Sequence, residues 1–127
     1  MAHTCIEVPL FDYPLILCTS KRELARALQG KYPDLLNTME ARVAADALGP
    51  IGLSTGWFNE LTTGEGDVIC GVICVDSRKD VNTVAHESTH AAMAILDFSH
   101  VEIAPDNHEV LAYLVGYIAE KITENWK

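Results

Sequence analysis

The pattern of hydrophobic and polar residues predicts a β-hairpin in the middle of the chain. Residues 67–76 are almost entirely apolar, which is typical of a strand that is buried on both faces. Residues 51–61, which include Trp57 and Phe58, predict a strand before it, and a glycine-bearing turn over 62–66 joins the two. We therefore expect a small sheet that is covered by helices.

Two amphipathic helices are predicted after this hairpin. The first spans residues 80–97, and the second begins near Asp106, which can cap it. A connector over residues 99–105 separates them. Helical spacing predicts that the first helix buries Val81, Val84, Ala85, Ala91, Ala92 and Ile95. It predicts that the second buries Val110, Leu111, Leu114, Val115, Ile118 and Ile122.

The first half of the chain predicts one strand and two more helices. The strand covers residues 13–19. A capping-box pattern opens a helix over 20–29, and a second helical repeat runs from residue 33 to 48 before a Gly-Pro pair. The sequence contains no repeats and no long linker. We therefore predict one α+β domain over residues 1–127.

Composition and charge exclude some classes of function. The 127 residues are 49% hydrophobic and 21% charged, as in ordinary globular proteins. The net charge is −9, from 18 acidic and 9 basic residues, whereas a nucleic-acid-binding surface is usually basic. We therefore expect no nucleic-acid partner.

The N-terminal segment and the cysteines predict a cytoplasmic protein. Residues 1–18 lack a basic start and an unbroken apolar run, so we expect neither a signal peptide nor a membrane span. Reducing conditions disfavour disulfides. Cys70 and Cys74 lie within an apolar strand pattern and are predicted to be core residues rather than metal ligands.

The sequence His86-Glu87-Ser88-Thr89-His90 predicts a metal site on the first of the two C-terminal helices. Residues four apart share one helix face, with Cβ atoms about 5–6 Å apart, so both imidazoles can bind one ion. Glu87 lies one step around the helix, where it can reach a water molecule on that ion. This arrangement is typical of a catalytic zinc site that keeps one coordination position open.

The third ligand is predicted from the second helix. Glu109 follows His90 by nineteen residues, and the connector is long enough to bring it back beside His90. His108 is an alternative ligand, because imidazole also binds zinc well. A further possibility is that Glu109 only caps the helix together with Asp106. We prefer Glu109 as the ligand.

His86, Glu87, His90 and Glu109 resemble the pattern of the gluzincin branch of the zincin metallopeptidases. Residues 84–122 are also similar to small uncharacterised proteins of tailed bacteriophages, which share an HE-x-x-H helix and a following E-x-x-A-Y helix. The gluzincin resemblance implies a zincin-like domain with Zn²⁺ held by the two histidines and Glu109. It also implies a substrate strand along the sheet edge.

The chain departs from that family at two points. Larger gluzincins often carry an aspartate four residues after the ligand glutamate, where this chain has Tyr113. They also use a second domain that stabilises the transition state. Tyr113 or Tyr117 could supply such a donor here, although both could simply be packed helix residues.

We therefore predict a zinc-dependent metallopeptidase in which Glu87 is the general base and Tyr113 a candidate donor. Its partner would be a protein or peptide substrate. If the protein is phage-encoded, it would act in the host cytoplasm. Two alternatives stay open: a non-catalytic binding module on a zincin-like scaffold, and a zinc hydrolase of a non-peptide amide. The sequence does not predict the oligomeric state.

Overall fold

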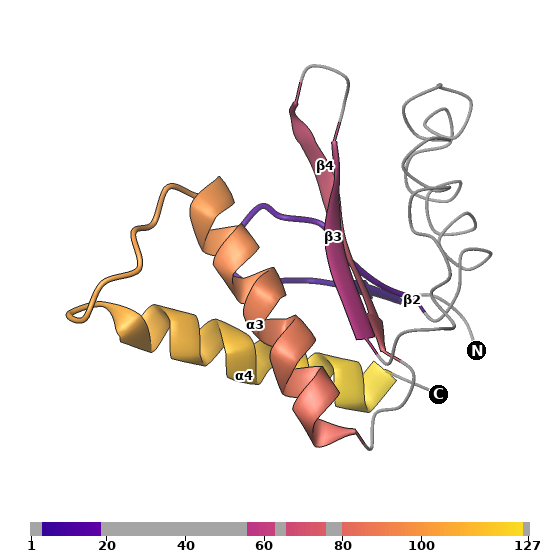
Figure 1. Ribbon diagram of the computed structural model, residues 1–127. Helices are drawn as coiled ribbons and strands as arrows, with labels where there is room; N and C mark the ends of the chain where they lie inside the picture. The colour runs from indigo at the N-terminus through magenta and orange to yellow at the C-terminus, as the bar shows by residue number, and fades with distance from the viewer. Residues whose placement is uncertain (1–3, 19–55, 63–65, 76–79, 126–127) are drawn as a thin grey trace.

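The computed structural model describes residues 4–18, 56–62, 66–75 and 80–125 (Figure 1). Within this part of the chain the fold is α+β, as predicted, with helices α3 and α4 crossing on one side of a sheet. The elements are β1 (Thr4–Ile6), β2 (Leu15–Cys18), β3 (Gly56–Thr62), β4 (Val68–Val75), α3 (Val81–Phe98) and α4 (His108–Asn125). The helices predicted over 20–29 and 33–48 lie outside the described residues, so they and the prediction of a single domain stay untested.

The sheet has the strand order β1-β2-β4-β3. Strands β3 and β4 pair antiparallel, from Gly56 opposite Val75 to Thr62 opposite Val68, which confirms the predicted hairpin. Strand β2 pairs parallel to β4 and antiparallel to β1. Strand β3 therefore stands last in the order of the described strands.

Strand β1 is a finding that the sequence did not predict. Its three residues are too few to show the alternation of apolar and polar positions that marks a longer strand. The strand predicted over 13–19 is confirmed as β2, at Leu15–Cys18. Its parallel pairing with β4 also went unpredicted, because hydrophobic periodicity indicates burial but not which strands are neighbours.

The two helices and the sheet share one hydrophobic core. Alternation along β2 and β4 directs one set of side chains towards the helices, and nearly all of them are fully buried. This set and its helical partners include Leu15, Leu17, Ile73, Val75, Ala91, Ala92, Ile95, Leu96, Leu114, Ile118 and Ile122. The opposite set of strand side chains, Ile16, Cys70, Val72 and Cys74, is equally buried. Strand β4 is thus buried on both faces, and Cys70 and Cys74 are core residues, as predicted.

Helix α3 matches the predicted helix to within one residue at each end. Val81 and Ala85, which were predicted to be buried, are exposed, because they lie outside the stripe that packs on the core. Asp80 caps it: one carboxylate oxygen accepts a hydrogen bond from the Thr83 backbone N–H at 3.1 Å, and the other accepts from the Thr83 hydroxyl at 2.7 Å. The hydrogen bond from the Thr83 hydroxyl, and to a smaller extent that from the Thr83 backbone N–H, lower the pKa of Asp80. After the helix, His100 adopts a left-handed conformation with φ of 60°, which turns the chain away from the helix axis.

Helix α4 begins at His108, two residues after the predicted cap Asp106. The hydrogen bonds at its start involve Asn107 instead. The Asn107 carbonyl accepts from the Val110 N–H at 3.3 Å, and its side-chain oxygen accepts from the Ala104 N–H at 2.7 Å. An amide side chain can both donate and accept, which suits Asn107 to this tight connector. In the described part of the chain, neither helix is long and apolar enough to cross a membrane.

Tyr13 ties the N-terminal segment to the sheet by packing directly over Gly71 of β4. Its hydroxyl donates to Glu60 Oε2 at 2.7 Å, and its ring meets that of Phe98 edge-on, with centroids 5.4 Å apart. Burial and the Glu60 carboxylate raise the pKa of Tyr13, which keeps the phenol protonated as a donor. A Cβ atom at Gly71 would lie 2.7 Å from the Tyr13 oxygen.

We therefore expect Gly71→Ala to destabilise the fold by about 1–3 kcal/mol, because the added methyl group must displace Tyr13 from its buried position. Gly116→Ala on α4 is the matched control, since a Cβ atom there meets nothing within 4 Å and alanine favours helix. Urea denaturation of both variants measures the difference. Equal stability of the two variants would show that Tyr13 yields to the methyl group without cost.

Candidate metal centre

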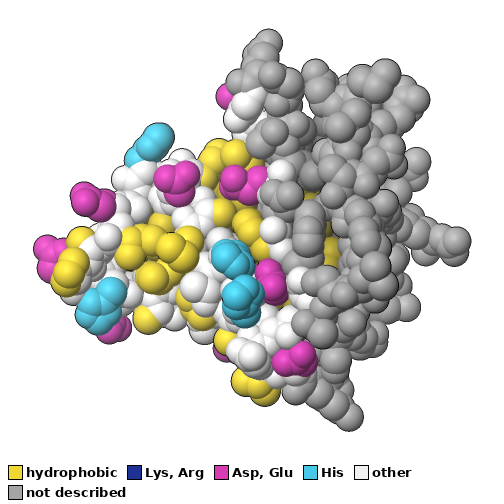
Figure 2. All heavy atoms as spheres, in the orientation of Figure 1, with side chains coloured by type: hydrophobic (Ala, Val, Ile, Leu, Met, Phe, Trp, Pro, Cys, Tyr) yellow, Lys and Arg dark blue, Asp and Glu magenta, His cyan; other side chains and the backbone are white. Residues whose placement is uncertain are grey.

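His86 and His90 lie one turn apart on the solvent-facing side of α3, and the helix brings their rings together. Their Nε2 atoms are 3.2 Å apart, and the ring planes meet at 75°. The His86 side chain is 64% exposed. Figure 2 shows two histidine side chains side by side on the surface, next to an acidic side chain. The helix thus presents two imidazole nitrogens to solvent at one point, as predicted from the four-residue spacing.

The separation of the two nitrogens fits one tetrahedral metal ion. Zinc–nitrogen bonds of about 2.0–2.1 Å and a tetrahedral angle place two ligand nitrogens about 3.3–3.4 Å apart. The observed 3.2 Å differs little from that value. The same distance also suits a hydrogen bond between two neutral imidazoles, in which one nitrogen donates and the other accepts. The geometry of the pair alone is therefore compatible with both arrangements.

Glu87 is the buried partner of this pair. Its side chain is only 10% exposed, and its Oε2 atom lies 4.0 Å from His86 Nε2. No described residue donates a hydrogen bond to this carboxylate. A buried carboxylate is costly unless a cation or a donor accompanies it. The Glu87 carboxylate thus lies beside the histidine pair, 4.0 Å from one imidazole nitrogen, where it can contact an ion or a water molecule held there.

The predicted third ligand, Glu109, has an exposed side chain. Glu109 and His108 occupy the first turn of α4, where their side chains are 92% and 64% exposed and 3.9 Å apart. Among the described residues, no three histidine, cysteine, aspartate or glutamate side chains form a group that could hold a metal ion. The structure thus brings His86, His90 and Glu87 together and does not add Glu109 to them. The role of Glu109 as a ligand stays a prediction.

Tyr113 and Tyr117 form an aromatic stripe on α4. Their rings stack with centroids 6.1 Å apart and an interplanar angle of 22°. The Tyr117 hydroxyl donates to the Glu7 carbonyl at 2.6 Å, so Tyr117 fastens α4 to the segment after β1. Tyr113 is half exposed, and none of the contacts among the described residues links it to the histidines. Its catalytic role also stays a prediction.

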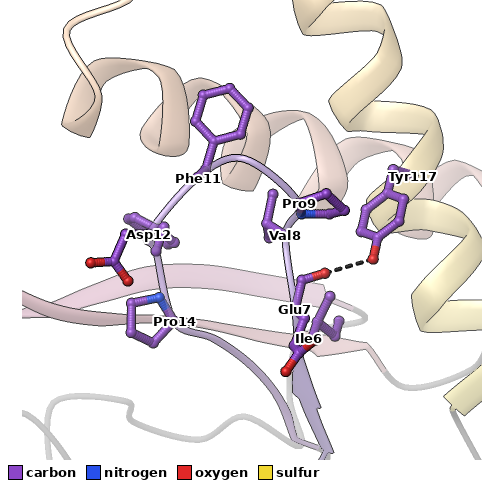
Figure 3. Close-up of a pocket in the computed structure, with 9 residues that line it drawn as sticks. Ile6, Glu7, Val8, Pro9, Phe11, Asp12, Pro14 and Tyr117 are labelled. Atoms are coloured by element: carbon purple, nitrogen blue, oxygen red, sulfur yellow. Dashed lines mark hydrogen bonds between the residues drawn. The ribbon is translucent and has the colours of Figure 1, made fainter.

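A separate cavity of about 600 Å³ lies beside Tyr117, and neither His86 nor His90 lines it. It is formed mainly by the loop between β1 and β2 (Figure 3). The Phe11 ring and the Asp12 carboxylate point outward from this loop rather than towards each other. Without converging polar side chains, the cavity offers no recognisable chemistry.

The structure adds Gly56 to the residues around the candidate site. This first residue of β3 lies against Thr83 and Glu87 of α3, close enough that a Cβ atom would collide with both side chains. In the predicted strand over 51–61, Gly56 is an interior glycine; such a glycine often marks a close approach, and this signal could have singled it out.

No protein-family model, curated protein or solved structure matches this chain. The geometry of the site is therefore the basis for the function proposed below.

Proposed function

We propose that the protein is a zinc-dependent hydrolase of peptide amide bonds, built on a zincin-like scaffold. His86 and His90 would hold the ion, with Glu109 as the predicted third ligand. The observation that carries the proposal is the pairing of two nitrogens 3.2 Å apart with a buried carboxylate 4.0 Å from one of them.

In the proposed reaction, the zinc ion would activate the substrate and the water molecule, and side chains of the protein would transfer the proton. Zn²⁺, when bound, polarises a carbonyl group and lowers the pKa of a coordinated water molecule to about 7. Glu87 would accept the proton of the attacking water and deliver it to the leaving amine. Its burial holds the carboxylate in one place and strengthens its electrostatic effect. The tyrosine hydroxyl of Tyr113 is the candidate for a second donor to the developing oxyanion.

The place of β3 supports a peptide substrate. Strand β3 stands last in the order of the described strands, and its first residue contacts α3 beside Glu87. The gluzincin resemblance implies a substrate strand along a sheet edge, a mode in which peptides bind through backbone hydrogen bonds. A peptide lying there would bring its backbone close to the Glu87 carboxylate. We place this activity in the cytoplasm, that of the host if the protein is phage-encoded.

A non-catalytic binding module is the second candidate. The exposure of Glu109 and the lack of a complete three-residue metal group in the described part favour it. In that case the two imidazoles would share a hydrogen bond. A zinc hydrolase of another kind of amide is the third candidate, and the choice of substrate distinguishes it from a peptidase.

Metal analysis and a cleavage assay test the proposal. Protein purified without chelator should contain one zinc ion per chain, and zinc at 100 times its Kd should stabilise the fold by about 2.7 kcal/mol. The same protein should cleave an unfolded protein substrate and stop when a chelator is added. A chain without zinc and without a gain in Tm would overturn the proposal. Stoichiometric zinc with no peptide cleavage would favour the binding module or another amide.

A further inference from the structure

The start of β3 approaches α3 unusually closely, at the point where Glu87 is held. A Cβ atom on Gly56 would lie 2.9 Å from Glu87 Cγ and 3.2 Å from Glu87 Oε2, and it would overlap the methyl group of Thr83. A Cβ atom essentially never lies closer than 3.0 Å to a heavy atom outside its own residue and its chain neighbours. The missing side chain at Gly56 therefore creates the space that Glu87 occupies.

From this contact we propose that Gly56 is a positioning residue for Glu87, an inference that rests on the proposed function. Thr83 and Glu87 are four residues apart, so they present the same face of α3 to β3. We call the space between Gly56, Thr83 and the Glu87 side chain the Gly56 notch. Thr83 lines this notch and is itself held by Asp80 through two hydrogen bonds of 2.7 and 3.1 Å.

The notch fixes where the Glu87 carboxylate stands relative to the histidines. The Glu87 side chain is 10% exposed, so a shift at Cγ cannot be absorbed by swinging the carboxylate freely into solvent. A methyl group at position 56 would therefore displace the carboxylate from its place 4.0 Å from His86 Nε2. A displacement of about 1 Å in a catalytic group can lower a rate about 100-fold.

The histidines should not be affected by the same change. His86 and His90 are exposed on α3, and neither of them is among the atoms nearest to a Cβ at Gly56. Filling the notch should thus separate two properties of the site: the ion stays bound, while the base is misplaced. A merely structural role of Gly56 would instead change metal binding and activity together, in step with the loss of folded protein.

Gly56→Ala tests this inference. We expect it to bind one zinc ion per chain with an affinity within about threefold of the wild type, while kcat falls about 100-fold and KM changes little. Gly116→Ala, which adds the same methyl group in open space on α4, should keep wild-type activity. Unchanged kcat in Gly56→Ala would overturn the proposal, as would a loss of zinc that parallels the loss of activity.

A second variant keeps the test valid if Gly56→Ala folds poorly. Thr83→Ser removes the methyl group that overlaps the new Cβ atom and keeps the hydroxyl that bonds to Asp80. Gly56→Ala combined with Thr83→Ser should therefore regain much of the lost stability. It should not regain kcat, because the contact with Glu87 Cγ persists. Recovery of full activity in this double variant would overturn the role of Gly56 in placing Glu87.

A measurement of stability tests the same contact without any assay of activity. In the Thr83→Ser background, Gly56→Ala should lower the urea midpoint when Glu87 is present and lower it less when Glu87 is replaced by alanine. An equal shift in both backgrounds would show that Gly56 and Glu87 are not coupled. This result is independent of metal, so it separates failure of the inference from failure of the proposed function. A wild-type chain that neither binds zinc nor cleaves peptides would overturn both.

Discussion

Replacing Glu87 by Gln should abolish hydrolysis and leave zinc binding intact. The substitution keeps the size and shape of the side chain in the Gly56 notch but removes its ability to accept a proton. Positioned general bases contribute about 10²- to 10⁴-fold to rate, so we expect kcat to fall by a factor in that range. The fold should not suffer, because a neutral amide replaces a carboxylate that is 10% exposed and has no hydrogen bond from a described residue.

Zinc content, kcat and the urea midpoint of Glu87→Gln, measured together, decide this prediction. Glu120→Gln makes the same chemical change at an exposed position of α4 and should behave like the wild type. If Glu87→Gln retains a rate within tenfold of the wild type, Glu87 is not the base. If it loses zinc as well, the carboxylate acts as a ligand rather than as a proton acceptor.

The sequence predicted best those elements that local periodicity determines. Helix α3 shows this clearly, because an apolar stripe, the cap at Asp80 and the lack of proline all indicate one helix. Strand β4 was predicted for a similar reason, as an apolar run bounded by turn residues. Strand β1 and the parallel pairing of β2 with β4 depend on contacts between distant parts of the chain. Such contacts leave no periodic signal in a single sequence.

The residues of the candidate site also differ in whether local spacing or contacts between distant segments determine their positions. His86, Glu87 and His90 lie within five residues of one helix, so helix geometry alone places the two imidazoles together and turns the carboxylate to their side. The place of Glu109 depends on how the connector returns the chain, and the spacing permits its return beside His90 without requiring it; its side chain is 92% exposed. The Gly56 notch depends on β3 meeting α3, which no spacing in the sequence encodes.

Replacing His90 by Ala should eliminate stoichiometric zinc binding. Loss of a group that merely supports a metal ligand costs about 10- to 100-fold in affinity, so loss of a ligand itself should cost more than 100-fold. The fold should persist without metal, because the His90 side chain is exposed on α3 and contributes little to the core. Zinc titration followed by the rise in Tm measures the change. His100→Asn, at an exposed connector position with φ of 60° that asparagine tolerates, is the control and should bind zinc like the wild type.

The same titration decides the third ligand. If Glu109 completes the site, Glu109→Ala should lose zinc as severely as His90→Ala, whereas His108→Ala should bind almost normally. The opposite result would assign the role to His108. Since both side chains lie on the first turn of α4 and are largely exposed, either assignment requires this turn to approach His90 when zinc binds. Normal binding by both variants, with binding lost in His90→Ala, would place the third ligand at another residue of the chain.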